Sequence, residues 1–320
     1  MTTPIVWDMT LSWNRMFRDE LTLPRFKAAG FDVVGLSVGA DTADAPSVAE
    51  ASIAAVRDTV ARFPERYLIA YTPQDIRRAQ REGKLALELN FQGTGPLAGS
   101  VQQVAHFHRL GVRHMGLVWN DQNLAGSSAT RGVDRGLSAY GRQLVREMNR
   151  VGIVVDGAHA SYRTTMDAMS ICEAPFIVSH TNVHALAPAY KNLRDDQIDA
   201  CAATGGVIGI SGLGSYLDDL EATPQALFRQ IDYVAQRVGS QHVGLGLDFV
   251  TDAPAFWKLV AANPQIWPGA DGASMPESKF FQPEGIGPLR RLLLDAGYSE
   301  HDVAGIFGAN WLRICDRCWK

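Results

Sequence analysis

Residues 136–159 read GLSAYGRQLVREMNRVGIVVDGAH, and this stretch contains one complete helix-to-strand unit. Apolar side chains recur in its first part at three- and four-residue steps, which predicts a helix over 136–151 with one apolar face: Leu137, Tyr140, Leu144, Val145 and Met148. Gly152 then ends the helix, and a β-branched run starts at once with Ile153. Such a short connection between helix and strand is typical of α/β barrels.

The same alternation runs along the whole chain and predicts a parallel sheet. Predicted strands are 4–10, 32–38, 67–71, 85–91, 114–119, 153–157, 175–179, 207–212 and 242–248, and predicted helices are 47–62, 74–82, 97–110, 136–151, 164–172, 195–204, 224–238 and 286–296. We therefore expect one domain over 1–320, an α/β fold of the (β/α)8 TIM-barrel type. Nine candidate strands for eight places leave one as an extra hairpin or a false assignment.

A doubly wound sheet is the alternative fold. Against it, no G-x-G-x-x-G motif follows an early strand, and polar residues are spread over many strand ends. The segment 250–287 holds five prolines and five large aromatic residues. It is predicted to be irregular and to serve as a lid, a substrate wall or a subunit contact.

Composition excludes several function classes. The formal net charge is −4 with no basic stripe, so a nucleic-acid partner is not expected. No apolar run is long enough to span a membrane, and the N-terminus lacks the pattern of a secretory signal. The four cysteines are too few to stabilise this chain by disulfides, which fits a reducing, cytoplasmic location.

Three polar residues stand where predicted strands end. His159 and His180 follow neighbouring strands, and Asp248 ends the apolar run that begins at Val243. In a barrel all three would lie at the mouth formed by the carboxyl ends of the strands. A lone histidine there is more often structural, but two histidines and an aspartate together favour a metal or acid–base site.

Several ordered motifs resemble the membrane dipeptidase family: VDGAH (155–159), VSHTN (178–182), KNLRDD (191–196), GGVIG (205–209) and GLGLDF (244–249). Segments within 136–152 and the tail IFGANWLR (306–313) also resemble that family, so the similarity covers most of the chain in order. The resemblance implies an amidohydrolase-type barrel with two zinc ions bridged by a glutamate, which hydrolyses dipeptides. It implies that His159 and His180 bind one zinc and that Asp248 orients the attacking water and shuttles a proton.

The sequence departs from the family at the remaining site positions. Thr10 and Ser12 stand where the resemblance implies a His-x-Asp pair, and Gln92 stands at the bridging glutamate. Trp119 replaces a substrate-contacting histidine, and Lys191 replaces an arginine that holds the substrate carboxylate. Hydroxyls and amides bring no negative charge for a second dication, so we expect one zinc ion or none.

Two further residues belong to the predicted site. Asp8 lies near the lost His-x-Asp pair, where it could supply a ligand or instead bond neighbouring backbone groups. Tyr190 could form an apolar wall with Trp119 in the substrate pocket, but for each residue alone packing is the more common role.

Three functions remain open from the sequence. The leading one is a hydrolase of a small amide, such as a dipeptide or a modified amino acid, with one zinc on His159 and His180, Asp248 as general base and Lys191 on an anionic group. The others are a metal-free lyase or isomerase and a non-catalytic binder of small acids. The partner is a small molecule in each case, and a homodimer is plausible from the resemblance.

Overall fold

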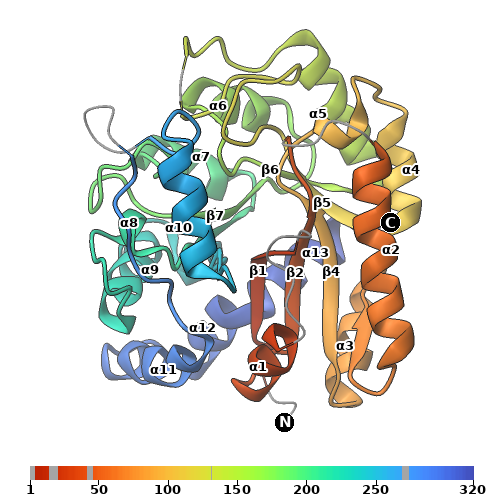
Figure 1. Cartoon of the computed structure of the whole chain (residues 1–320). Coiled ribbons are helices and arrows are strands. Elements are labelled where there is room, and N and C mark those ends of the chain that lie inside the picture. The colour runs from red at the N-terminus through yellow and green to blue at the C-terminus, as the bar shows by residue number, and fades with distance from the viewer. Residues whose placement is uncertain (1–3, 14–20, 42–45, 131, 269–273) are drawn as a thin grey trace.

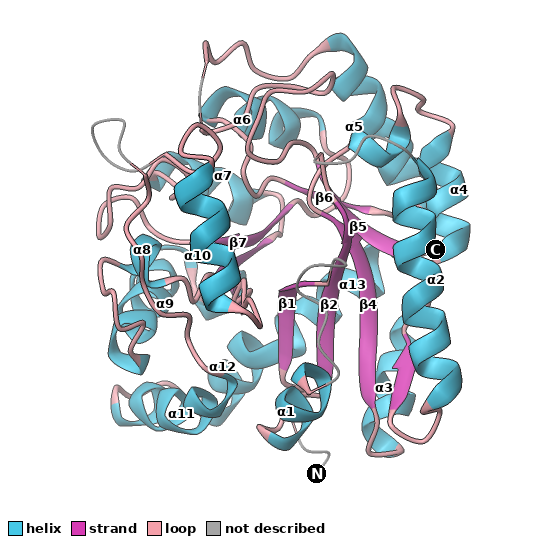
Figure 2. Cartoon of the chain, viewed as in Figure 1, coloured by secondary structure: helices cyan, strands magenta, loops and turns pink. Residues whose placement is uncertain are grey.

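A parallel sheet wrapped by helices forms the centre of the molecule (Figures 1 and 2). The computed structural model describes residues 4–13, 21–41, 46–130, 132–268 and 274–320. Its strands are β1 (Trp7–Ser12), β2 (Val33–Gly39), β3 (Tyr67–Ile69), β4 (Leu85–Phe91), β5 (Val112–Gly116), β6 (Val154–Asp156), β7 (Ile177–Thr181), β8 (Val207–Ile210) and β9 (Val243–Leu245). The α-helices are α1 (Thr22–Ala28), α2 (Pro46–Arg62), α3 (Pro73–Arg81), α4 (Gln103–Leu110), α5 (Ala139–Val151), α6 (Tyr162–Ile171), α7 (Asp195–Ala203), α8 (Gly214–Leu217), α9 (Pro224–Val238), α10 (Ala253–Ala262), α11 (Ile286–Asp295), α12 (Glu300–Ala304) and α13 (Asn310–Cys318).

Eight of these strands follow one another around a nearly closed barrel, in the order β1-β2-β4-β5-β6-β7-β8-β9. A bridge between Leu11 and Phe249 brings the two ends of this path together. The predicted barrel is thus confirmed, and the doubly wound alternative is wrong because such a sheet stays open. The ninth strand, β3, pairs only with β4, in parallel, so it is a real strand outside the barrel rather than a hairpin.

The sequence of the α5–β6 unit explains where its helix starts and ends and which face it buries. The Ser138 hydroxyl accepts a hydrogen bond from the Gly141 N–H at the helix start, and Gly152 ends the helix with a φ of 97°. Leu144, Val145 and Met148 are buried against the sheet. The helix begins at Ala139 rather than 136 because Ser138, whose backbone is extended, is its N-cap.

Several predicted boundaries are wrong in a way that matters for the site. Strand 114–119 is in fact β5, which ends at Gly116, and strand 242–248 is β9, which ends at Leu245. The apolar residues that follow are buried in loops over the barrel mouth, and burial alone does not distinguish strand from loop. Helix 97–110 is likewise shorter, since α4 starts at Gln103 after a turn.

The segment 250–287 is less irregular than predicted over its described parts, 250–268 and 274–287, and the rest of this prediction lies outside the described residues. Asp252 caps α10 by accepting a hydrogen bond from the Ala255 N–H, and Pro254 occupies the first turn of the helix, where proline is tolerated. In Figure 1 α10 lies in the foreground, to the left of β1. At this position Pro254 therefore marks the start of a helix rather than an irregular stretch of chain.

The C-terminal helix closes the opposite end of the barrel. Trp311 of α13 is fully buried, and its indole N–H donates to the Leu245 carbonyl oxygen at 3.1 Å. Gly244 is required at this contact, because a Cβ there would lie 2.4 Å from the Trp311 ring. Among the described residues, no helix has the length and apolar content needed to cross a bilayer.

Candidate active site

Two imidazoles from neighbouring strands meet at the barrel mouth. His180 lies within β7, and His159 lies three residues after β6 with a positive φ of 65°. Their Nε2 atoms are 2.7 Å apart, within hydrogen-bond distance, and both side chains are buried. The structure thus brings together the two histidines that the sequence singled out.

Asp248 and Lys191 lie beside this pair. The Asp248 Oδ2 atom is 3.9 Å from His180 Nε2 and 3.5 Å from Lys191 Nζ. The Lys191 ammonium also lies 4.8 Å from the centre of the Tyr216 ring, a cation–π contact. Asp248 has a φ of 54°, so two site residues other than glycine, Asp248 and His159, adopt the left-handed backbone region. Such conformations cost free energy and concentrate at functional sites.

The hydrogen-bond network assigns the protons of the histidine pair. His159 Nδ1 donates to the Asn120 Oδ1 atom at 2.6 Å, which leaves His159 Nε2 as an acceptor. His180 then donates through Nε2, and its Nδ1 accepts from the Thr10 hydroxyl at 3.4 Å. The Ser179 hydroxyl, 2.8 Å from the same Nδ1, gives its own proton to Asp156.

Burial and charge set the ionisation of these groups. Burial lowers the pKa of His180 to about 4, and the Lys191 charge adds to this effect. The pKa of His159 is also well below its usual value, through burial and the same charge. For Asp248 burial opposes ionisation, but the neighbouring His180 and Lys191 outweigh burial and lower the pKa. Burial also lowers the pKa of Lys191, although the neighbouring Asp248 partly opposes this effect. At neutral pH the site therefore holds a neutral imidazole pair beside an ionised Asp248.

A chain of buried polar side chains supports the pair from within the barrel. Glu88 is fully buried and accepts hydrogen bonds from His114 Nδ1 and Asn90 Nδ2, both at 3.1 Å. On its other side, His114 Nε2 lies 3.9 Å from Asp156, the carboxylate that holds Ser179. Burial lowers the pKa of His114, but the Glu88 carboxylate outweighs it and raises the pKa above the usual value. His114 therefore lies in the middle of β5 as the partner of a buried acid.

The positions that depart from the family make polar contacts of their own. Gln92 Nε2 donates to the Ser37 hydroxyl at 3.0 Å, and Ser12 lines the cavity described below. Thr10 contacts His180, as described above. Asp8 is buried and accepts hydrogen bonds from the backbone N–H groups of Leu247 and Thr10, at 2.7 and 3.3 Å. Asp8 thus joins β1 to the loop that follows β9, just before Asp248.

These donors do not fit the paired-zinc site that the resemblance implies. Thr10, Ser12 and Gln92 offer only neutral oxygens, and among the described residues no three His, Cys, Asp or Glu side chains are arranged to hold a metal ion. Two nitrogens on one tetrahedral zinc would lie about 3.3 Å apart, given zinc–nitrogen bonds of about 2.0 Å. The His159 and His180 nitrogens are closer than that and bond to each other.

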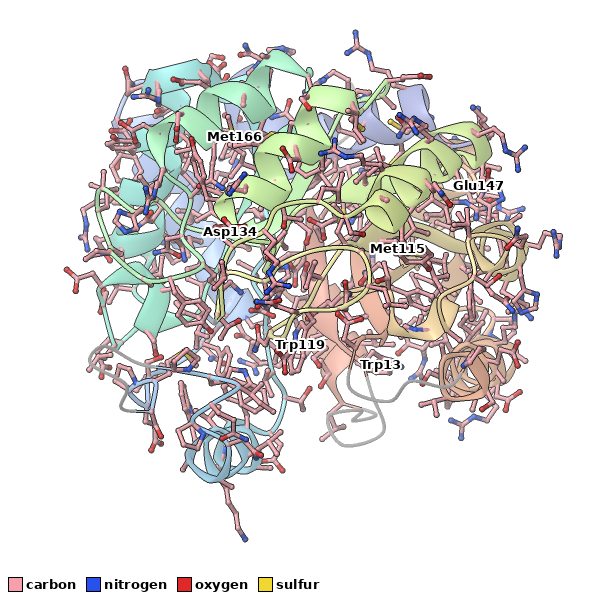
Figure 3. All side chains as sticks on the ribbon, turned by 90° about the horizontal axis from the view of Figure 1, so that it is seen from above. Trp13, Met115, Trp119, Asp134, Glu147 and Met166 are labelled. Carbon is pink, nitrogen blue, oxygen red and sulfur yellow. The ribbon has the colours of Figure 1, made fainter. Side chains whose placement is uncertain are left out.

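A cavity of about 770 Å³ opens over this polar cluster. Asp248, Lys191 and His159 line one part of it, and the Trp119 ring lies 6.1 Å from the His159 ring. Figure 3, seen from above, shows Trp119 near the middle of the molecule, beside the ends of the red strands. The predicted wall residue Tyr190 is placed differently. It lines a neighbouring cavity of about 650 Å³, and its hydroxyl bonds that of Tyr216 at 2.7 Å.

Sequence reasoning missed Asn120, Ser179 and Tyr216. Asn120 and Ser179 are adjacent to residues that were singled out, Trp119 and His180, and a buried histidine needs a partner for each ring nitrogen. The need for such partners could have pointed to polar residues near the two histidines. Nothing in the sequence around Tyr216 indicated that its ring would cover the Lys191 ammonium.

The barrel and the polar cluster at its mouth define an amidohydrolase-type barrel hydrolase. The match to a solved amidohydrolase from Pseudomonas aeruginosa is close, with a TM-score of 0.86 and 25% identity over 99% of this chain and 97% of that one. The profile of the membrane dipeptidase family (peptidase family M19) matches residues 14–266. The chain therefore belongs to the membrane dipeptidase family, a family of hydrolases.

Individual relatives agree with this assignment. Dipeptidase tcpJ of Claviceps purpurea is 36% identical over 58% of this chain, and an uncharacterized dipeptidase of Schizosaccharomyces pombe is 36% identical over 75%. The chain spans 45% and 54% of the lengths of these two relatives. A metallo peptidase from Rhodobacter sphaeroides, solved with a phosphinate mimic of the dipeptide L-Ala-D-Ala, shares the fold with a TM-score of 0.80 at 22% identity, over 99% of this chain and 100% of that one.

Proposed function

We propose that this chain is a dipeptidase-like hydrolase of a small amide that carries a carboxylate, such as a dipeptide or a modified amino acid. One observation supports the proposal above the others. Asp248, Lys191 and the His159–His180 pair converge on the wall of one cavity at the carboxyl ends of the strands, where barrel enzymes place their chemistry. Family membership supplies the reaction class.

Each polar group has a separate role in this proposal. Lys191 binds the substrate carboxylate, because it is the cation that lines the cavity beside Asp248. Asp248, ionised at neutral pH, takes a proton from the attacking water and returns it to the leaving amine nitrogen. The His159–His180 pair, 3.9 Å from Asp248 through His180, orients that carboxylate and excludes bulk water.

Because the donors do not fit a paired-zinc site, no step of the proposed reaction passes through a metal. A single zinc, the alternative expected from the sequence, would have only His159 and His180 as nitrogen ligands. A panel of dipeptides and N-acyl amino acids, incubated with chelator-treated protein and assayed for released amino acid, tests the proposal. We expect turnover that survives chelation. Zinc-dependent turnover with about one zinc per chain would support the single-zinc mechanism instead.

A non-catalytic binder of small acids is the second candidate. The loss of three charged or imidazole ligand positions, now Thr10, Ser12 and Gln92, favours it. It predicts that small acids raise the melting temperature without being turned over and that Asp248→Asn leaves their affinity largely unchanged.

Two further properties are part of the proposal. All four cysteines are unpaired, which supports a reducing, cytoplasmic location. A homodimer is proposed from the family resemblance alone, and sedimentation equilibrium of the purified chain would test it.

A further inference from the structure

The lining of the cavity combines two kinds of side chain. Asp248 and Lys191 bring charged groups, and several aromatic side chains bring apolar surface. Four of these form what we call the aromatic wall: Trp119, Phe256, Trp267 and Phe280. Three of the four come from the segment 250–287, so this segment faces the cavity.

The aromatic wall is continuous and begins at the reaction centre. The Trp119 ring lies 6.1 Å from the His159 ring and 5.5 Å from the Trp267 ring, in an edge-to-face arrangement with the latter. Phe256 then contacts both Trp267 and Phe280, with ring centres 6.1 and 5.5 Å apart. Edge-to-face packing of this kind is favourable and leaves ring faces and edges to contact a ligand.

Other contacts hold the wall in place. The Trp119 backbone N–H donates to Asp41 Oδ2 at 2.8 Å, and Phe280 pairs with Leu213 through a backbone bridge. Phe256, Trp267 and Phe280 are buried, with at most 9% of their surface exposed. A wall that is already ordered costs little conformational entropy when an apolar group packs against it.

The size of the cavity agrees with a large apolar group. Cavities of 300–1,000 Å³ hold drug-sized ligands, and this one is about 770 Å³. Trp119 stands where the family resemblance implies a histidine. Beside His159 it therefore offers apolar surface in place of a ring that forms hydrogen bonds.

We propose that the cavity takes a small acid bearing a large aromatic or branched apolar group, with its carboxylate on Lys191 and the apolar group against the aromatic wall. The position of a scissile amide between these two groups rests on the proposed function. Recognition of the acid itself does not, because it requires binding only.

Calorimetric titration with 3-phenylpropionate and propionate tests the proposal, since these acids differ only in the phenyl group. Wild-type protein should bind 3-phenylpropionate at least about tenfold more tightly, because burial of even a few apolar carbons contributes that much. Trp267→Ala should bring this ratio close to one. Trp319→Ala removes the same side chain far from the cavity and should leave the ratio unchanged. Lys191→Met should weaken both acids by a similar factor.

A second substitution guards against a Trp267→Ala protein that does not fold. Trp119→His puts back the ring type implied by the family and should also lower the ratio severalfold. Equal affinity of the two acids for wild-type protein, no binding of either, or a ratio that both wall substitutions leave intact would overturn the proposal. A high ratio without dipeptide turnover would remove the proposed function and leave the subsite standing. Equal turnover of Ala-Ala and Ala-Phe, together with a ratio of the two acid affinities near one, would remove the apolar subsite and leave the proposed function standing.

Discussion

The Nε2 atoms of His159 and His180 lie 2.7 Å apart and form a hydrogen bond across the ends of two neighbouring strands. His159 is fixed by Asn120 and His180 by Thr10, so each ring has a partner for its other nitrogen. The pair is therefore a self-contained polar unit at the mouth of the barrel.

Restoring the family's ligands should restore metal binding. Wild-type protein, purified with zinc and passed through a desalting column, should retain well below one zinc per chain by elemental analysis. The triple variant Thr10→His, Ser12→Asp and Gln92→Glu adds two acidic groups and an imidazole, and it should retain more than one zinc. Close to one zinc per wild-type chain would contradict the geometric argument.

Asp248→Asn should lower kcat/KM by at least about a hundredfold on any dipeptide that the wild-type protein hydrolyses, because it removes the general base. Asparagine keeps the size of the side chain, so the fold should be preserved, as circular dichroism can check. Asp252→Asn, which alters a nearby exposed helix cap, is the matched control. Undiminished turnover by Asp248→Asn would assign the base to another group.

His114→Ala should destabilise the fold far more than His106→Ala. His114 is the ionic partner of the fully buried Glu88, whereas His106 pairs with Glu50 at the surface. Leaving a buried charge without its partner costs about 3–5 kcal/mol, and an exposed pair contributes at most about 1 kcal/mol. Urea denaturation of both variants measures the difference in the free energy of unfolding. Equal losses would contradict the role of His114 as the partner of a buried acid.

Asn120→Ala should leave the Nδ1–H group of His159 buried without an acceptor. The expected loss of stability is about 1–3 kcal/mol, together with lower activity because the ring is no longer held in one tautomer. Asn123→Ala, in the same loop, serves as the comparison for stability. Activity that falls only in step with stability would show that Asn120 does not position the ring.

Asp8 should make stability depend on pH. Burial raises the pKa of its carboxyl from 3.8 to about 7. Between these values the unfolded chain has released this proton and the folded chain still holds it, so the free energy of unfolding falls as pH rises from about 4 to about 7. The slope from one group is at most about 1.4 kcal/mol per pH unit. Asp8→Asn keeps an acceptor for the Leu247 N–H but should lose this pH dependence of the free energy of unfolding. If wild-type and variant stabilities changed in parallel with pH, the prediction would be wrong.

The sequence by itself determined the barrel and the identity of its main polar residues. Apolar periodicity is a local property, so the α5–β6 unit could be read from Leu144, Val145, Met148 and Gly152 alone. His159, His180 and Asp248 could be singled out because the carboxyl ends of parallel strands share one edge.

Only the tertiary structure decided how these residues are partnered. Contacts between Lys191 and Asp248, His114 and Glu88, or Trp119 and Trp267 join residues that are distant in the chain. No local pattern records such contacts, because they depend on strand register and on how loops cross the barrel mouth. The sequence predicted 250–287 to be a lid, a substrate wall or a subunit contact, but only the fold decided which of its aromatic side chains line the cavity.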